Sequence, residues 1–172
     1  ETTTISFSTS EYGSPLSIGD DALIGRTFAL DLAGAHLRER AGFGAIIGAF
    51  VENPLLMGIS EIDTTEGEIE FIAAEGNLGS DGVVRQDMDK HTVHFEDGDW
   101  SGAPYFAAST EWLLIVYEAI GSPTTKIPLH DVDFEGTFNA DATLIGGGRL
   151  TGLVDTRHMG PLIGLGSHES AW

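Results

Sequence analysis

The sequence contains no cysteine in 172 residues. Without thiols the chain cannot form disulfides, thiolate-ligated metal sites or iron–sulfur clusters, and it has no cysteine nucleophile. Several short signatures are missing as well. No Gly-x-Ser-x-Gly nucleophile elbow occurs, and the glycines 146–148 are not followed by the Lys-Ser/Thr of a phosphate-binding loop. Position 47, where a dinucleotide fingerprint that starts at Gly42 needs glycine, holds isoleucine.

Basic residues are scarce, because eight Lys and Arg stand against 27 Asp and Glu, giving a formal net charge of −19 at pH 7. A chain this negative repels phosphate backbones, so we expect no nucleic-acid partner. Long apolar runs are also lacking. The uncharged apolar stretch 41–51 has eleven residues, whereas a helix needs about 20 to span a bilayer. We therefore expect no transmembrane segment.

Short segments of alternating apolar and polar residues recur along the chain, separated by some of its 23 glycines. Such alternation is typical of half-buried β-strands. It predicts strands in five segments: 27–32, 68–73, 92–96, 131–138 and 149–156. The last two flank the turn-rich segment 139–148 and predict a β-hairpin. Segment 112–117 is apolar on both sides, which indicates a strand buried on both faces or a short helix.

Residues 43–51 depart from this pattern, because their large apolar residues recur at helical spacing. The helix is predicted to end at Asn53-Pro54, since the residue before proline is pushed out of the α region. No face of it carries charge, so we expect it to be enclosed or docked. Four of its side chains are then candidate ligand or partner contacts: Phe43, Ile46, Ile47 and Phe50.

Seven to nine short strands and one apolar helix predict a mainly β domain. The expected architecture is an antiparallel β-sandwich or barrel, with the short apolar helix packed on it or plugging it. An apolar fraction of 41% is enough for one core in a chain of this length. We expect residues 1–12 to form a Ser/Thr-rich linker or frayed strand, residues 13–166 the domain and residues 167–172 a flexible tail.

The densest polar run, 87–99, contains four aspartates that are candidate calcium ligands: Asp87, Asp89, Asp97 and Asp99. Carboxylate oxygens are the ligands that calcium prefers, although the run lacks the twelve-residue pattern of an EF-hand. Zinc binding by His91 and His94 is a second option, but residues three apart on a strand point to opposite faces. A solvated edge strand and loop is the simplest interpretation.

Asp131 and Asp133 are predicted to share one strand face, about 6.6 Å apart at the rise of a β-strand. Paired carboxylates can carry out acid–base chemistry on a glycoside. Glu135 and Thr137 continue the same face, however, as they would in an ordinary exposed strand.

Aromatic residues gather between Trp100 and Tyr117, and Trp112 is a candidate contact for a ligand or partner. Core packing is the alternative role for these side chains. Three arginines, Arg26, Arg149 and Arg157, are expected to pair with nearby carboxylates.

The chain begins with Glu1 rather than methionine and continues with a Ser/Thr-rich stretch. By analogy with linkers that follow a lipid anchor or export signal in bacterial surface proteins, we expect an exported domain. It would lie in the periplasm or at the cell surface, with a lipid anchor upstream of residue 1 as one means of attachment.

Four segments together resemble a known group of proteins: 23–32, 104–106, 134–141 and 147–157. Their order, with Leu-Ile-Gly-Arg-Thr-Phe first and Gly-Gly-Arg-Leu-Thr-Gly-Leu-Val-Asp-Thr-Arg last, is similar to that of uncharacterised lipoprotein-like β domains of bacterial cell envelopes. The resemblance covers most of residues 20–165. It implies a strand, glycine-rich hairpin and strand, and it assigns no activity and no role to any residue.

These observations favour a non-catalytic exported or cell-envelope domain. It would act as a structural or accessory subunit of a larger assembly, through a protein partner or self-association. One alternative is a lipocalin-like carrier of a lipophilic small molecule, with residues 43–51 lining the cavity. The other is a glycoside hydrolase-like enzyme that uses Asp131 and Asp133.

Overall fold

The computed structural model describes residues 12–30, 54–117 and 125–154. These ranges contain one short 3-10 helix and eight strands: η1 (Asp20–Ala22), β1 (Thr27–Leu30), β2 (Leu55–Asp63), β3 (Glu68–Leu78), β4 (Val84–Gln86), β5 (Val93–Asp99), β6 (Tyr105–Tyr117), β7 (Thr125–Phe138) and β8 (Ile145–Val154). The mainly β class is therefore confirmed. The predicted helix at 43–51, with Phe43, Ile46, Ile47 and Phe50, lies outside the described residues.

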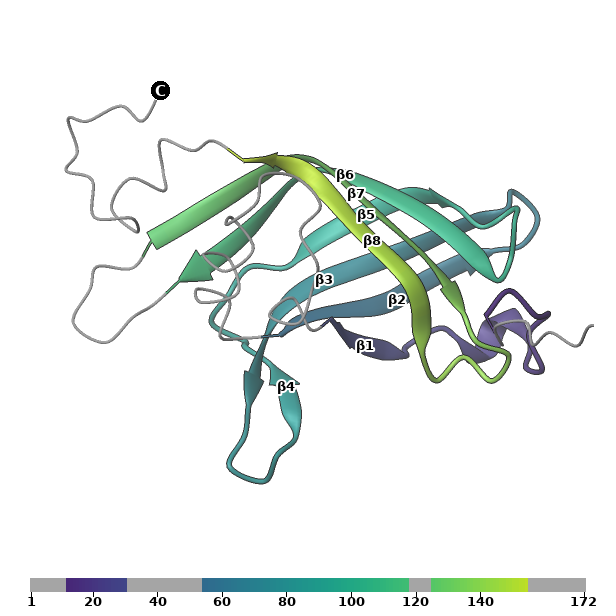
Figure 1. The fold of residues 1–172 in the computed structure, drawn as a ribbon, viewed down its shortest axis with the longest axis horizontal. Coiled ribbons are helices and arrows are strands. Elements are labelled where there is room, and N and C mark those ends of the chain that lie inside the picture. Colours follow the sequence, from purple (N-terminus) through teal and green to yellow (C-terminus); the bar gives the residue numbers. More distant parts are fainter. Residues whose placement is uncertain (1–11, 31–53, 118–124, 155–172) are drawn as a thin grey trace, which may run out of the picture.

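The strands form one antiparallel sheet in the order β1-β2-β3-β5-β6-β7-β8, and β4 pairs only with the end of β3. The sheet curls into half of a barrel (Figure 1). Within the described ranges, no strand pairs with the outer edge of β1 or of β8. The expected sandwich or barrel is thus an open, curled antiparallel sheet.

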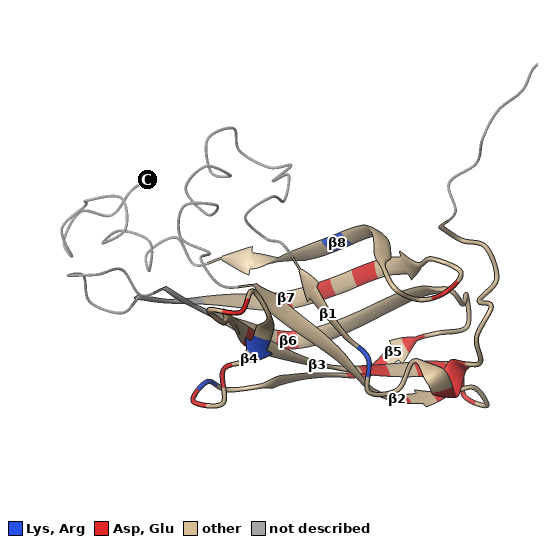
Figure 2. Ribbon diagram, turned by 90° about the horizontal axis from the view of Figure 1, so that it is seen from below, with Lys and Arg blue, Asp and Glu red and all other residues tan. Residues whose placement is uncertain are grey.

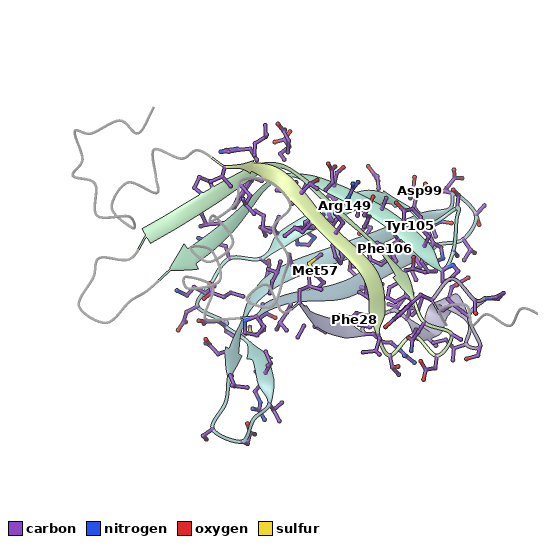
Figure 3. All side chains as sticks on the ribbon, viewed as in Figure 1. Phe28, Met57, Asp99, Tyr105, Phe106 and Arg149 are labelled. Carbon is purple, nitrogen blue, oxygen red and sulfur yellow. The ribbon has the colours of Figure 1, made fainter. Side chains whose placement is uncertain are left out.

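The concave face of this sheet carries the core. Its centre is a set of phenylalanines from β3, β5, β6 and β7, each at most 1% exposed: Phe71, Phe95, Phe106, Phe134 and Phe138. Ring centroids within this set lie 4.9 to 6.5 Å apart, in tilted or edge-on geometry that aromatic rings favour. Figure 3 shows Phe106 and Met57 in this interior. Aromatic side chains therefore fill the part of the half-barrel that these strands enclose.

The segment before β1 connects the two ends of the curled sheet. The Arg26 guanidinium donates to the backbone oxygen of Ala22 at 2.8 Å, and to those of Asp141 and Ala142, in the β7–β8 turn, at 3.1 and 2.8 Å. The Phe28 ring packs on Phe138, with centroids 5.4 Å apart. Within the described residues Arg26 thus binds backbone carbonyls. Asp31 and Asp155, two of the carboxylates nearest to the predicted arginines in the sequence, and Arg157 itself lie outside these residues.

The predicted hairpin is confirmed as β7 and β8, although β8 begins at Ile145, inside the segment expected to be loop. The turn is tight because the Asn139 side chain holds it: its Oδ1 accepts from the backbone N–H groups of Thr143 and Leu144, both at 2.9 Å. Segment 112–117 belongs to β6, so it is a strand and not a helix. It is not buried on both faces as expected, because Trp112 is 42% exposed.

Candidate functional site

Three large or aromatic side chains stand exposed on the convex face, across the last three strands. Trp112 on β6 is 42% exposed and lies directly opposite His130 on β7. His130, which is also exposed, lies directly opposite Leu153 on β8, whose exposed fraction is 63%. We call these three residues the Trp112 cluster.

A change of side-chain direction in β6 explains why Trp112 faces solvent. Phe106 and Ala108 point into the core, and continued alternation would place Trp112 on the same inner face. Instead Leu113 takes the inward position and is only 2% exposed. The alternation of inward and outward side chains along β6 therefore shifts by one residue between Ala108 and Leu113, and Trp112 points outward as a result.

The neighbouring strand carries the matching irregularity at Asp131. The register between β7 and β8 shifts between His130 and Asp133, and Asp131 has a φ of 48°. A non-glycine residue in this left-handed region costs on the order of 1 kcal/mol. Such bulges re-aim side chains at sheet edges and functional sites. Here the bulge brings one tryptophan, one histidine and one leucine together on the outside of the protein.

Acidic residues lie beside the Trp112 cluster. Figure 2 shows Asp and Glu along β7, next to a basic residue on β8. Thr151 donates to Asp133 Oδ2 at 3.2 Å, whereas the bulged Asp131 and the neighbouring Glu111 are exposed carboxylates. The surroundings of the cluster are therefore negative.

Further along β7, Glu135 joins three strands. Its Oε2 accepts from the Tyr105 hydroxyl at 3.1 Å, and its Oε1 lies 2.7 Å from Arg149 Nε. The hydrogen bond to Glu135 raises the pKa of Tyr105 above its ordinary value, so this phenol stays protonated. Arg149 thus has the carboxylate partner that the sequence predicted, and both Glu135 oxygens are engaged.

Asp131 and Asp133, the carboxylates proposed for glycoside chemistry, are both exposed on the convex face, as alternation predicted. The bulge lies between His130 and Asp133, so these residues do not follow the regular rise on which their expected separation rested. The hypothesis of catalysis by this pair stays a prediction.

The four candidate calcium ligands lie toward the two ends of β5. Asp87 and Asp89 precede the strand, where the Asp89 N–H donates to Asp87 Oδ1 at 3.0 Å. Asp99 accepts from the Ser101 hydroxyl at 2.6 Å and from its N–H at 2.9 Å, and these bonds lower the Asp99 pKa. Asp97 is exposed and has a φ of 53°. Among the described residues, no three His, Asp or Glu side chains form a group suited to a metal. Calcium binding therefore stays a prediction.

Of the candidate contacts, the structure thus places Trp112 on the surface and unites it with two residues that sequence reasoning did not select. His130 and Leu153 join it only through strand pairing, which leaves no local signal.

The described residues thus form a curled, half-barrel β-sheet that carries the exposed Trp112 cluster on its convex face. Comparison with protein-family models, curated proteins and solved structures finds no match to this chain. Among the described residues, no helix has the length and apolar character needed to cross a membrane.

Proposed function

We propose that the protein is a non-catalytic exported or cell-envelope domain that serves as an accessory subunit by docking a partner protein on the Trp112 cluster. The observation that carries this proposal is the outward-facing Trp112, 42% exposed at a bulge. Tryptophan dominates binding energy at many interfaces, because it buries a large apolar area with few rotatable bonds. A tryptophan that served only to stabilise the fold would instead point into the core, where the same apolar area would be buried within the chain.

Charge favours a different protein over a second copy of this chain. Glu111, Asp131 and Asp133 lie around or beside the cluster, and the chain has a net charge of −19. Two copies joined here would bring like charges together, whereas a partner with a basic rim and an apolar centre would be attracted. The partner is therefore expected to present Lys or Arg side chains around an apolar contact.

Site-specific photo-crosslinking tests this proposal. A benzophenone amino acid replaces Trp112 in one variant and Leu144 in the other. Leu144 is a matched control, because it is 54% exposed but lies in the β7–β8 turn. In extracts of the source cells we expect one defined protein to crosslink at position 112 and not at position 144.

The purified partner then gives the quantitative test. Trp112→Ala should weaken its Kd at least about 30-fold, as at other interface hot spots, whereas Leu144→Ala should change it less than about threefold. Raising salt should weaken the wild-type complex. The proposal fails if both positions crosslink the same proteins, if the crosslinked product is a dimer of this chain, or if Trp112→Ala leaves the Kd unchanged.

A further inference from the structure

Around Trp112, two adjacent strands each expose two consecutive residues to solvent. On β6 these are Glu111 and Trp112, and on β7 they are His130 and Asp131. Neighbours along a regular strand point to opposite faces, so one residue of each pair would normally be buried. The shifted alternation of β6 and the bulge of β7 therefore bring two carboxylates to the surface beside the indole ring.

Strand pairing places these two carboxylates at the same level of the sheet. Glu111 and Asp131 are the single residues between two pairs that lie directly opposite each other. These pairs are Thr110 with Val132, and Trp112 with His130. Each carboxylate is therefore one position away from the Trp112 cluster, and we call Glu111 and Asp131 the flanking carboxylates.

The flanking carboxylates differ from the next acidic residues along β7. Asp133 accepts from Thr151, and Glu135 pairs with Arg149. Within the described ranges, neither flanking carboxylate makes a hydrogen bond or an ion pair. Their charges are thus available to a cation on a bound molecule.

The three arginines in the described part of the chain are each engaged elsewhere. Arg26 binds backbone oxygens, Arg85 pairs with Asp81, and Arg149 pairs with Glu135. A cation supplied by a partner would therefore reach the flanking carboxylates without competition from these arginines.

An arginine side chain suits this surface better than a lysine. The face of an indole ring attracts a cation, by about 0.5–1 kcal/mol at exposed sites and about 2 kcal/mol where water is excluded. A guanidinium is planar and weakly hydrated, so it stacks flat on the ring while its N–H groups reach carboxylates, whereas an ammonium holds its water more strongly. The methylene groups of arginine can also lie on an apolar neighbour, such as Leu153, which is 63% exposed.

We propose that the partner of the Trp112 cluster binds through an arginine, which stacks on the Trp112 indole with Glu111 and Asp131 as its counter-charges. This inference rests on the proposed docking function and names the chemistry of the contact. A lysine in the same place binds less tightly, and a neutral side chain of the shape of arginine does not bind measurably.

Three tripeptides that differ only in their middle residue test the proposal before the partner is known: acetyl-Leu-Arg-Leu-amide and its lysine and citrulline counterparts. Citrulline has the shape of arginine without its charge. The peptides are titrated at about 0.15 M salt, where long-range attraction to the negative chain is largely screened, and nuclear magnetic resonance follows the indole N–H signal of Trp112. We expect the arginine peptide to shift this signal saturably, with a Kd of about 1–10 mM. The lysine peptide should bind at least about threefold more weakly, and the citrulline peptide should not saturate. Equal affinity for the arginine and lysine peptides, or no saturation by the arginine peptide, overturns the proposal.

Variants then test the residues assigned to the contact. Glu111→Gln and Asp131→Asn should each weaken binding of the arginine peptide about two- to fivefold, as expected for loss of one exposed charge pair. Glu61→Gln is the matched control, because it removes one exposed carboxylate from β2 and should leave the Kd unchanged. If Glu61→Gln and Glu111→Gln weaken binding equally, net charge governs it and the proposal is wrong. Trp112→Leu keeps an apolar side chain, and the preference for arginine over lysine should disappear in this variant, as measured at the backbone amide signal of Leu153; a preference that persists overturns the proposal.

The outcomes distinguish this inference from the docking function on which it rests. If position 112 crosslinks a partner protein but the peptides show no preference for arginine, docking stands and arginine recognition is wrong. If the preference for arginine holds but no protein is crosslinked at position 112, the arginine contact stands and the proposed docking function is wrong.

Discussion

Phe106 is the residue whose replacement tests the core most directly. Its side chain is 0% exposed, and its ring lies 4.9, 5.0 and 5.1 Å from those of Phe71, Phe134 and Phe138. Phe106→Leu keeps an apolar side chain but removes all three ring contacts. At about 0.5–1.5 kcal/mol each, these contacts sum to about 1.5–4.5 kcal/mol. Because the neighbours relax in part, we expect a loss of about 2–3 kcal/mol of unfolding free energy.

Urea unfolding followed by far-ultraviolet circular dichroism measures this loss, and Phe28→Leu is the matched comparison. Phe28 is half-buried on β1, and its ring contacts that of Phe138 at the margin of the core. We expect this variant to lose only about 1 kcal/mol. The melting temperature of Phe106→Leu should fall by about 5–10 °C. If both variants lose the same unfolding free energy, the set of buried phenylalanines around Phe106 is not the centre of the core.

Two further predictions concern close packing and charge. Gly98→Ala should lower the free energy of unfolding by about 1–3 kcal/mol, because the new Cβ would lie 2.6 Å from the Ile69 backbone oxygen. Gly148→Ala is the control, since a Cβ there would have nothing nearer than 3.9 Å. Equal urea midpoints for the two variants would contradict the close packing at Gly98. Burial, followed by repulsion from Asp97 and other nearby carboxylates, raises the pKa of Glu68. The folded state therefore holds this proton more tightly than the unfolded state, and the charged form destabilises the fold above the raised pKa. Glu68→Gln should raise the melting temperature at pH 7, and this gain should disappear at a pH below the ordinary glutamate pKa of 4.5. An equal gain at pH 7 and at the acidic pH would show that the charge of Glu68 is not its cause.

The alternation of apolar residues predicted much of the sheet, because most strands bury one face only. β1, β3, β5 and the β7–β8 hairpin follow from it. β2 did not, since its first three residues, 55–57, are all buried and therefore show no alternation. β4, with three residues, is too short to leave a periodic signal.

The functional surface was harder to predict for a related reason. Trp112 was selected as an aromatic residue, but its outward direction depends on a bulge, and a bulge is set by the pairing of β7 with β8. His130 and Leu153 come next to Trp112 only in the register of β6, β7 and β8. Sequence reasoning identifies neighbours along one strand, whereas this surface is made across strands.

The way in which Arg26 joins the ends of the sheet has a consequence for behaviour in acid. Its three acceptors among the described residues are backbone oxygens, which do not take up protons in the range where carboxylates do. Acidification would neutralise the 27 carboxylic side chains and leave the eight basic residues to make the chain positive, yet it would leave these three hydrogen bonds intact. This link between the segment before β1 and the β7–β8 turn thus rests on contacts that do not titrate, in a protein rich in groups that do.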